Sequence, residues 1–251
     1  QSSREVAKHI KAPEDEVCLL GNATDATMTV LSRWSSAISN SSEASARPTR
    51  VLALNWGYRA NKNALDHYIG GSGGVVVESD VPFPMRQMSS AEANNTILEN
   101  LERTLKEHSP RFALLEHIHS QPSILLPLKE MIALCRERGV EEIAVDAAHA
   151  IGSISNLDVP AFGADFYYSN LHKWGCTPLS CTLFYSTKMT STIYPVVSWH
   201  YREGLKAETQ FSGTRDYSAC VAAPYGLDWL RKFTSLDGVG YEDYNHREVL
   251  R

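Results

Sequence analysis

The chain alternates short apolar runs with longer segments in which apolar residues recur every three or four positions. The runs are typical of buried β-strands, and the longer spacing is typical of amphipathic helices. Strands that are separated by helices usually pair in parallel. We therefore expect a three-layer α/β/α fold with a mostly parallel mixed sheet. The expected strands are 51–55, 74–79, 112–118, 142–148, 165–170 and 181–186, and the clearest helices are 93–108 and 126–139.

Composition places the chain among ordinary globular proteins. Its 251 residues are 43% hydrophobic and 21% charged, which suffices for one large core. A formal net charge of -5 gives no basic footprint for nucleic acid or anionic membranes. No apolar run approaches the roughly 18 residues that span a bilayer, and the first residues do not resemble a signal peptide. We expect no nucleic-acid or membrane partner and a cytoplasmic location.

The five cysteines form an odd set without a CxxC pair. Neither a disulfide framework nor a metal site is therefore indicated, and we expect free thiols.

Asp146 lies near the end of the expected strand 142–148, and Lys173 follows the next expected strand, 165–170. Ligands of such sheets gather at the carboxyl ends of the strands. A lysine there can carry pyridoxal phosphate as a Schiff base, and an aspartate can keep the pyridine nitrogen protonated. The pair predicts a pyridoxal-phosphate enzyme with Lys173 and Asp146 as catalytic residues. The alternative for Asp146 is a structural cap of the next turn.

A polar turn at 22–24 opens an expected helix and offers a site for the cofactor's phosphate. Helix N-termini bind anions through their backbone N–H groups, and Thr24 adds a hydroxyl. The alternative is that Asn22 or Thr24 serves as the N-cap of the helix, a role that is compatible with phosphate binding. His172, beside Lys173, is a second candidate for the phosphate.

Three more side chains are candidates for the cofactor's ring. His149, three residues after Asp146, is a candidate for the phenolic oxygen, although histidines are more often structural. Trp56 and Tyr58 follow the expected strand 51–55, and we expect one of them, preferably Tyr58, to stack on the pyridine. Packing at the rim of the core is the alternative for both aromatics.

Four motifs occur in order along the chain. They are NATDA (22–26), DAAHAIG (146–152), SNLHKW (169–174) and FSGTRD (211–216). Together they resemble the class V aminotransferase group of fold-type I pyridoxal-phosphate enzymes. Within that group, segment 114–152 resembles the isopenicillin N epimerase-like branch, and especially the plant-type L-cysteine desulfhydrases.

The resemblance implies a role for each matched residue. It implies Lys173 as the Schiff-base lysine, Asp146 as the pyridinium partner and His149 near the phenolic oxygen. It also implies that His117 faces cofactor and substrate. The phosphate contacts implied are Ala23, Thr24 and His172, with Gly213 and Thr214 reaching the phosphate of the neighbouring subunit, so that a homodimer shares its active sites.

Two features of the group have no match in the sequence. The group carries an N-terminal segment and a C-terminal small domain with an arginine for the substrate carboxylate. We therefore expect residues 1–251 to be the cofactor-binding large domain of a longer protein, a fragment that lacks the N-terminal segment and most of the small domain. Arg59, Arg202 and Arg215 cannot be given the arginine's role. Cys176 and Cys181 do not match the nucleophilic cysteine of the desulfurases, and we interpret both as packing thiols.

The predicted reaction is β-elimination from L-cysteine or a related cysteine conjugate, with L-cysteine giving sulfide, pyruvate and ammonia. Three alternatives stay open at this point. An epimerase needs a second acid, for which Tyr58 or His117 are candidates, and an aminotransferase needs Lys173 to reprotonate the aldehyde carbon. The third is a non-catalytic scaffold with the same fold.

Overall fold

One sheet organises the part of the chain that the computed structural model describes, namely residues 1–40, 48–85, 88–188, 195–233 and 238–249. Its strand order is β1-β7-β6-β5-β4-β2-β3. Neighbours from β3 to β6 pair in parallel, whereas β7 is antiparallel to both β6 and β1. The strands are β1 (Val17–Leu20), β2 (Arg50–Leu54), β3 (Val75–Ser79), β4 (Phe112–Glu116), β5 (Glu142–Asp146), β6 (Phe166–Asn170) and β7 (Thr182–Ser186).

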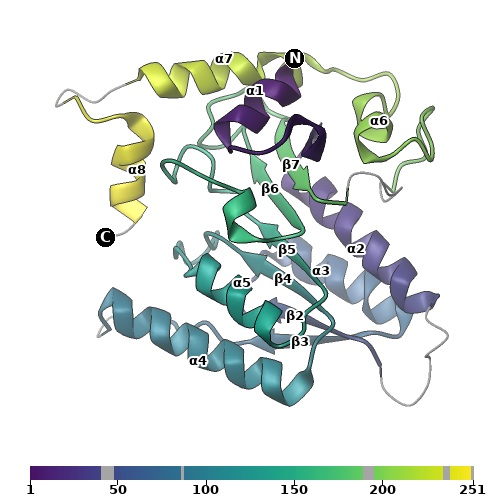
Figure 1. Cartoon of the computed structure of the whole chain (residues 1–251), viewed down its shortest axis with the longest axis vertical. Coiled ribbons are helices and arrows are strands. Elements are labelled where there is room, and N and C mark those ends of the chain that lie inside the picture. Colours follow the sequence, from purple (N-terminus) through teal and green to yellow (C-terminus); the bar gives the residue numbers. More distant parts are fainter. Residues whose placement is uncertain (41–47, 86–87, 189–194, 234–237, 250–251) are drawn as a thin grey trace.

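Helices cover both faces of this sheet (Figure 1). One apolar core joins the sheet to α2 and α3, and a second joins it to α1, α4, α5 and α7. The predicted three-layer α/β fold is confirmed. The helices are α1 (Ser2–His9), α2 (Ala23–Ser39), α3 (Arg59–Tyr68), α4 (Ser90–His108), α5 (Leu128–Glu137), α6 (Leu205–Gln210), α7 (Ser218–Lys232) and α8 (Tyr241–Val249).

Alternation along the strands divides the side chains between the two cores. In β6, Tyr167 packs in the core of α1, α4, α5 and α7, while Tyr168 packs in the core of α2 and α3. Leu115 and Leu114 of β4 divide in the same way. Successive residues of a strand point to opposite faces, so both faces of a covered sheet must be apolar.

The sequence located most of these elements. Each expected strand corresponds to one of β2 to β7, with ends that differ by at most two residues, and the two expected helices correspond to α4 and α5. Gly139, just after α5, has a φ of 82°, the left-handed conformation that favours glycine after a helix. Strand β1 was not predicted, because its four residues are too few to show a period.

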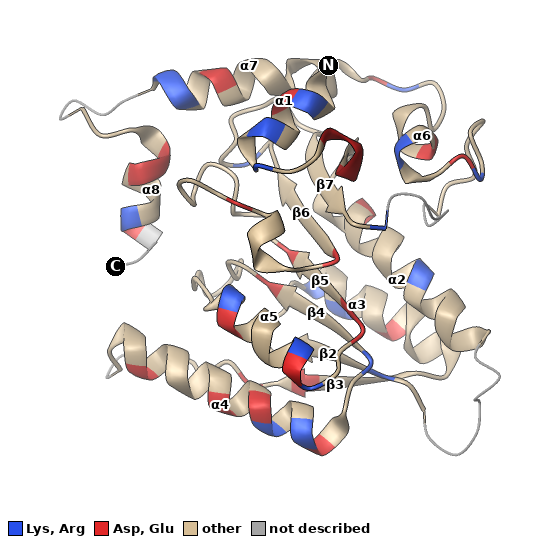
Figure 2. Ribbon diagram, viewed as in Figure 1, with Lys and Arg blue, Asp and Glu red and all other residues tan. Residues whose placement is uncertain are grey.

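Charges of both signs are interspersed on the outer helices α4 and α5 (Figure 2). Glu102, for example, lies between Lys106, 2.8 Å away, and Arg138. None of the helices in the described ranges is both long enough and apolar enough to span a bilayer.

All five cysteines are unpaired, as predicted. Cys181 is buried and fits the prediction of a packing thiol, whereas Cys176 is exposed and that prediction is wrong for it.

Candidate active site

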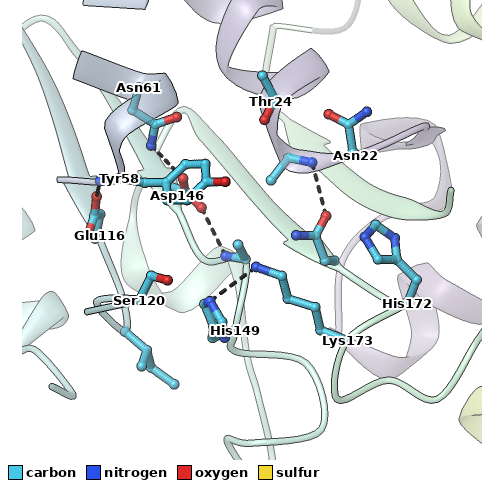
Figure 3. A pocket seen from close by; sticks show the side chains of 14 residues that line it. Asn22, Thr24, Tyr58, Asn61, Glu116, Ser120, Asp146, His149, His172 and Lys173 are labelled. Atoms are coloured by element: carbon cyan, nitrogen blue, oxygen red, sulfur yellow. Dashed lines mark hydrogen bonds between the residues drawn. The ribbon is translucent and has the colours of Figure 1, made fainter. Parts of the chain in front are cut away.

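A cavity of about 650 Å³, including solvent at its mouth, lies at the carboxyl ends of the parallel strands. This is the usual ligand position in such a sheet. Figure 3 shows its side chains converging from α2, α3 and the strand ends. The lining residues are Asn22, Ala23, Thr24, Tyr58, Asn61, Glu116, Ile118, Ser120, Asp146, Ala148, His149, Asn170, His172 and Lys173.

Asp146, the last residue of β5, is almost fully buried at one side of this cavity. Its Oδ2 accepts a hydrogen bond of 2.6 Å from the amide of Asn61, and its Oδ1 accepts one of 3.0 Å from the backbone N–H of Ala148. Burial raises the pKa of Asp146 to about 6, and the charge of nearby Glu116 acts in the same direction. The carboxylate is thus charged at neutral pH but would be stabilised further by a cation.

Glu116 ends β4 directly opposite Asp146 in the strand register. Its Oε1 accepts a hydrogen bond of 3.0 Å from the backbone N–H of Tyr58, and its Oε2 bonds His119 Nδ1. Glu116 therefore ties the segment after β2 to the segment after β4 at the edge of the cavity.

Lys173 and His149 meet at the other side of the cavity (Figure 3), with Lys173 Nζ 3.1 Å from His149 Nε2. The indole N–H of Trp174 donates to His149 Nδ1 over 3.3 Å. Because an indole is only a donor, a neutral His149 must carry its proton on Nε2. That proton then points at Lys173, whose amine must accept it with its lone pair.

The pKa values of both groups are shifted toward the neutral form. Burial, helped by Lys173, lowers the pKa of His149 to about 4. Burial also lowers the pKa of Lys173, although the charge of Asp146 acts in the opposite direction. The geometry thus favours the nucleophilic, neutral form of the Lys173 amine.

The loop that carries Lys173 is packed closely by two glycines. Gly152 has a φ of 81°, and a Cβ there would lie 2.0 Å from the carbonyl oxygen of Trp174. A Cβ at Gly226, on α7, would lie 2.7 Å from Thr177 Cγ2 and 3.0 Å from the carbonyl oxygen of Gly175. The loop can take this course only because both positions lack a side chain.

The N-terminus of α2 reaches the cavity beside His172. Asn22 is the N-cap, since its side chain accepts a hydrogen bond of 2.8 Å from the backbone N–H of Asp25. The N–H of Ala23 donates to the side chain of Asn170 over 3.0 Å. Thr24 lines the cavity, as does His172, whose Nδ1 accepts a hydrogen bond of 3.2 Å from the backbone N–H of Cys181, so that Nε2 carries the proton of a neutral ring. The helix end, the Thr24 hydroxyl and His172 Nε2 suit an anion.

These features fit pyridoxal phosphate. Asp146 is a buried carboxylate that lacks a hydrogen-bonded cationic partner among the described side chains, and a protonated pyridine nitrogen would supply one. The α2 N-terminus suits the phosphate, and the amine of Lys173 lies in the same cavity.

The sequence profile of class-V aminotransferases matches residues 1–236. The chain belongs to the class-V aminotransferase family. The resemblance inferred from the four motifs is thereby confirmed.

Individual members of this family are similar over most of the chain. An L-cysteine desulfhydrase from Arabidopsis thaliana is 36% identical over 242 residues, which are 94% of this chain and 52% of that protein. A probable chloroplastic L-cysteine desulfhydrase from the same plant is 36% identical over 259 residues, 99% of this chain and 53% of that protein. The chain thus spans about half the length of these curated relatives.

A solved structure supports the same fold at lower identity. It is the complex of the cystine C-S lyase C-DES with cysteine persulfide, with a TM-score of 0.73 and 18% identity, and it covers 93% of this chain and 61% of that one.

Two of the predicted site residues, Trp56 and His117, are not among the lining residues of the cavity. The Trp56 indole donates to the carbonyl oxygen of Val81 over 2.9 Å, so Tyr58, which lines the cavity, is the aromatic candidate that remains. His117 Nδ1 lies 2.9 Å from the Tyr167 hydroxyl, and the ring is not among the lining residues. The preference for Tyr58 over Trp56 agrees with this lining, and the contact of His117 with the cofactor stays a prediction.

Gly213 and Thr214 follow α6 and are also absent from the lining. Their expected role concerns the neighbouring subunit's phosphate and stays a prediction. Arg59, Arg202 and Arg215 do not line the cavity either, and no arginine occurs among its described lining residues.

Sequence reasoning missed Asn61, Glu116 and Asn170. Glu116 had a usable signal, because it ends the strand next to that of Asp146. Asn61 and Asn170 had none beyond their position near the end of an element.

Proposed function

We propose that the chain is the cofactor-binding large domain of a pyridoxal-phosphate-dependent lyase that breaks the C–S bond of L-cysteine or a related cysteine conjugate. With L-cysteine, the products of β-elimination are sulfide, pyruvate and ammonia. The observation that carries the proposal is one cavity that unites Lys173, Asp146 and the α2 N-terminus in a chain 36% identical to an L-cysteine desulfhydrase.

Two ends of the cavity have different tasks in this proposal. When bound, pyridoxal phosphate supplies an aldehyde that holds the amino acid and a protonated ring that withdraws electrons from Cα. Asp146 holds the proton on the ring nitrogen, because an ionised carboxylate stabilises the positive charge. Thr24 and His172 hold the phosphate, and His149 contacts the phenolic oxygen.

Lys173 holds the cofactor in the resting enzyme and moves the substrate's proton during turnover. Its amine has a lowered pKa and accepts a hydrogen bond from His149, so it is neutral more often than an ordinary lysine. A neutral amine can remove the Cα proton. The electron pair left on Cα then forms the second Cα–Cβ bond while the Cβ–S bond breaks, and the sulfur leaves with the electrons of that bond as a thiolate. Elimination needs no sulfur-accepting cysteine, and no cysteine lines the cavity among the described residues.

The partner we propose is a second copy of this chain. Val197 and Trp199 precede α6 and are 74% and 87% exposed, and Phe211, which follows α6, is 46% exposed. Large exposed apolar side chains on both sides of α6, in the segment that leads to Gly213 and Thr214, are typical of an interface. A homodimer would place these two residues at the partner's phosphate.

Our proposal for the compartment is the cytoplasm. One relative carries the name of a chloroplastic enzyme, so fractionation of cells with an antibody against this protein is the direct test.

Product analysis tests the activity. We expect the full-length protein, loaded with pyridoxal phosphate, to release sulfide and pyruvate from L-cysteine in equal amounts. L-Alanine, which has no β-leaving group, is the matched control and should give neither product.

Other outcomes would replace the proposal. Loss of optical activity from an amino acid without sulfide would indicate an epimerase. Formation of a 2-oxo acid only when an amino acceptor is present would indicate an aminotransferase, and the absence of cofactor uptake would favour a scaffold.

A further inference from the structure

A buried chain of hydrogen bonds runs from the sheet to Asp146. The Thr27 hydroxyl donates to Asn61 Oδ1 over 3.0 Å, and Asn61 Nδ2 donates to Asp146 Oδ2 over 2.6 Å. The Tyr168 hydroxyl lies 2.8 Å from the same Thr27 oxygen. All four side chains are at most 6% exposed, and they come from α2, α3, β5 and β6.

The direction of these hydrogen bonds is linked along the whole chain. A threonine hydroxyl has one proton, and Thr27 gives it to Asn61. Tyr168 must therefore be the donor to Thr27, and it keeps its proton because burial and the charge of Asp146 raise its pKa well above the ordinary value. Asn61, with its oxygen turned to Thr27, can present only N–H groups to Asp146.

Hydrogen bonds in the opposite direction would require a protonated Asp146. If the amide of Asn61 turned over, its oxygen would face Asp146 Oδ2, and a hydrogen bond at that distance would need a proton on the carboxyl. The Thr27 hydroxyl would then meet an N–H group instead of an acceptor. The arrangement found in the structure is therefore the one that selects the ionised form of Asp146.

We propose that Asn61, oriented by Thr27 and Tyr168, is a positioning residue that keeps Asp146 ionised and so sets the protonation of the cofactor's ring nitrogen. The inference rests on the proposed function for its catalytic meaning. Its first step concerns only residues of this chain and does not require the cofactor.

The hydrogen bonds from Tyr168 through Thr27 and Asn61, which we call the relay, act on Asp146 together with other groups. Burial and the charge of Glu116, from the adjacent β4, favour the protonated carboxyl. The backbone N–H of Ala148 and the charge of Lys173 favour the ionised form, as Asn61 does. Tyr167 and Tyr168 lie on the adjacent β6, and the charge of Asp146 raises the pKa of both.

The test follows the titration of Asp146 itself. The carboxyl ¹³C signal of Asp146 is recorded against pH in the full-length protein without cofactor, with Asp146→Asn used to assign it. In Thr27→Val, which keeps the shape and loses the hydroxyl, we expect the midpoint to rise by about one pH unit. In Asn61→Leu we expect a rise of about one to two units, because a hydrogen bond to a charged group is lost.

Two variants separate this role from a general effect on folding. Thr27→Ser keeps the hydroxyl and should restore the native midpoint. Thr29 is equally buried on α2, but its hydroxyl donates to the backbone oxygen of Asp25, so Thr29→Val should leave the midpoint unchanged. Tyr168→Phe, which removes only the terminal donor, should give a smaller rise and serves if Thr27→Val does not fold.

A second measurement uses the loaded protein. The absorbance of bound pyridoxal phosphate should show a smaller fraction of protonated ring nitrogen in Thr27→Val than in Thr27→Ser at the same pH, because a more basic Asp146 takes a larger share of the proton. An unchanged Asp146 midpoint in folded Thr27→Val and Asn61→Leu would overturn the proposal. A protein that takes up no cofactor would overturn the proposed function instead, while the titration without cofactor would still decide whether the relay acts.

Discussion

The two ends of the cavity are built in different ways. At the buried end, Asp146, Asn61 and Glu116 lie at strand ends or on the first turn of a helix, and each is held by hydrogen bonds from other elements. At the open end, Lys173 and His149 are partly exposed and lie on the loops that follow β6 and β5.

This difference suits two tasks. A group that fixes the charge of a ring gains from a dry, rigid setting, where electrostatic interactions are strongest. A lysine that first holds the cofactor and then carries a proton needs freedom to move. We therefore expect substitutions at the buried end to change chemistry, and substitutions at the open end to change loading. Each prediction below tests that division.

The largest effect is expected at the open end. Lys173→Ala should abolish covalent attachment of the cofactor and lower turnover by about 10³-fold or more, because anchor and base are lost together. Borohydride reduction followed by peptide mapping measures the attachment. Lys106→Ala, on the outer face of α4, is the control and should label normally at Lys173. A label on another lysine in the native protein would contradict the assignment.

At the buried end, Asp146→Asn should retain the cofactor and lose about 10²–10³-fold in turnover, since a fixed charge is removed. Equilibrium dialysis against pyridoxal phosphate and steady-state rates measure the two quantities. If Asp146→Asn bound pyridoxal phosphate weakly but turned over at the native rate when saturated with it, Asp146 would act in loading and the proposed division of tasks would be wrong.

The same variant should change how stability depends on pH. Without cofactor, the pKa of Asp146 is about 6 in the folded protein and 3.8 in the reference state. The folded state thus binds the proton more tightly, and the free energy of unfolding falls as pH rises through this interval, by about 3 kcal/mol in all. Urea titrations at pH 4 and 7 should show this fall in the native protein and a smaller one in Asp146→Asn. Equal falls would remove the argument that Asp146 titrates there.

A smaller effect is expected when the proposed hydrogen bond from Thr24 to the cofactor's phosphate is removed. Thr24→Ala should weaken binding of pyridoxal phosphate about ten- to hundredfold, the value of one hydrogen bond to a charged group. Pyridoxal, which lacks the phosphate, is the matched ligand and should bind both proteins equally. Thr24→Ser should behave as the native protein. A parallel loss for pyridoxal would mean that Thr24 acts on the ring or on the fold of α2.

The smallest effect concerns Trp174. Trp174→Phe removes the donor to His149 Nδ1 and frees the other tautomer, so Lys173 Nζ can be a protonated donor. We expect the pKa of Lys173 to rise by up to about one unit and the capture of pyridoxal phosphate at pH 8 to slow about 3–10-fold. Stopped-flow absorbance measures capture, and Trp229→Phe on α7 is the control. If both variants captured the cofactor at the native rate, the tautomer argument would fail.

The sequence predicted those site residues whose positions follow from the local pattern and the order of the strands. Asp146 and Lys173 follow apolar strands, and the carboxyl-end rule then places them together. Glu116 lines the cavity and His117 does not, because neighbouring residues near a strand end point to opposite faces.

The relay was out of reach for a different reason. Asn61 meets Asp146 across 85 positions of sequence and Thr27 across 34. Nothing in the short-range pattern around any of the three encodes that meeting, which follows from how α2 and α3 pack on the sheet. Strand β1 was missed because it is a four-residue edge strand.

Because Gly226 has no side chain, α7 can pack closely against the loop that carries Lys173. This helix contributes no atom to the described wall of the cavity, yet a single methyl group added to it would press on the backbone two and three residues beyond Lys173. A substitution at Gly226 would therefore affect catalysis indirectly, through the loop that positions the amine of Lys173. A tilt of α7 would therefore move the backbone that follows Lys173.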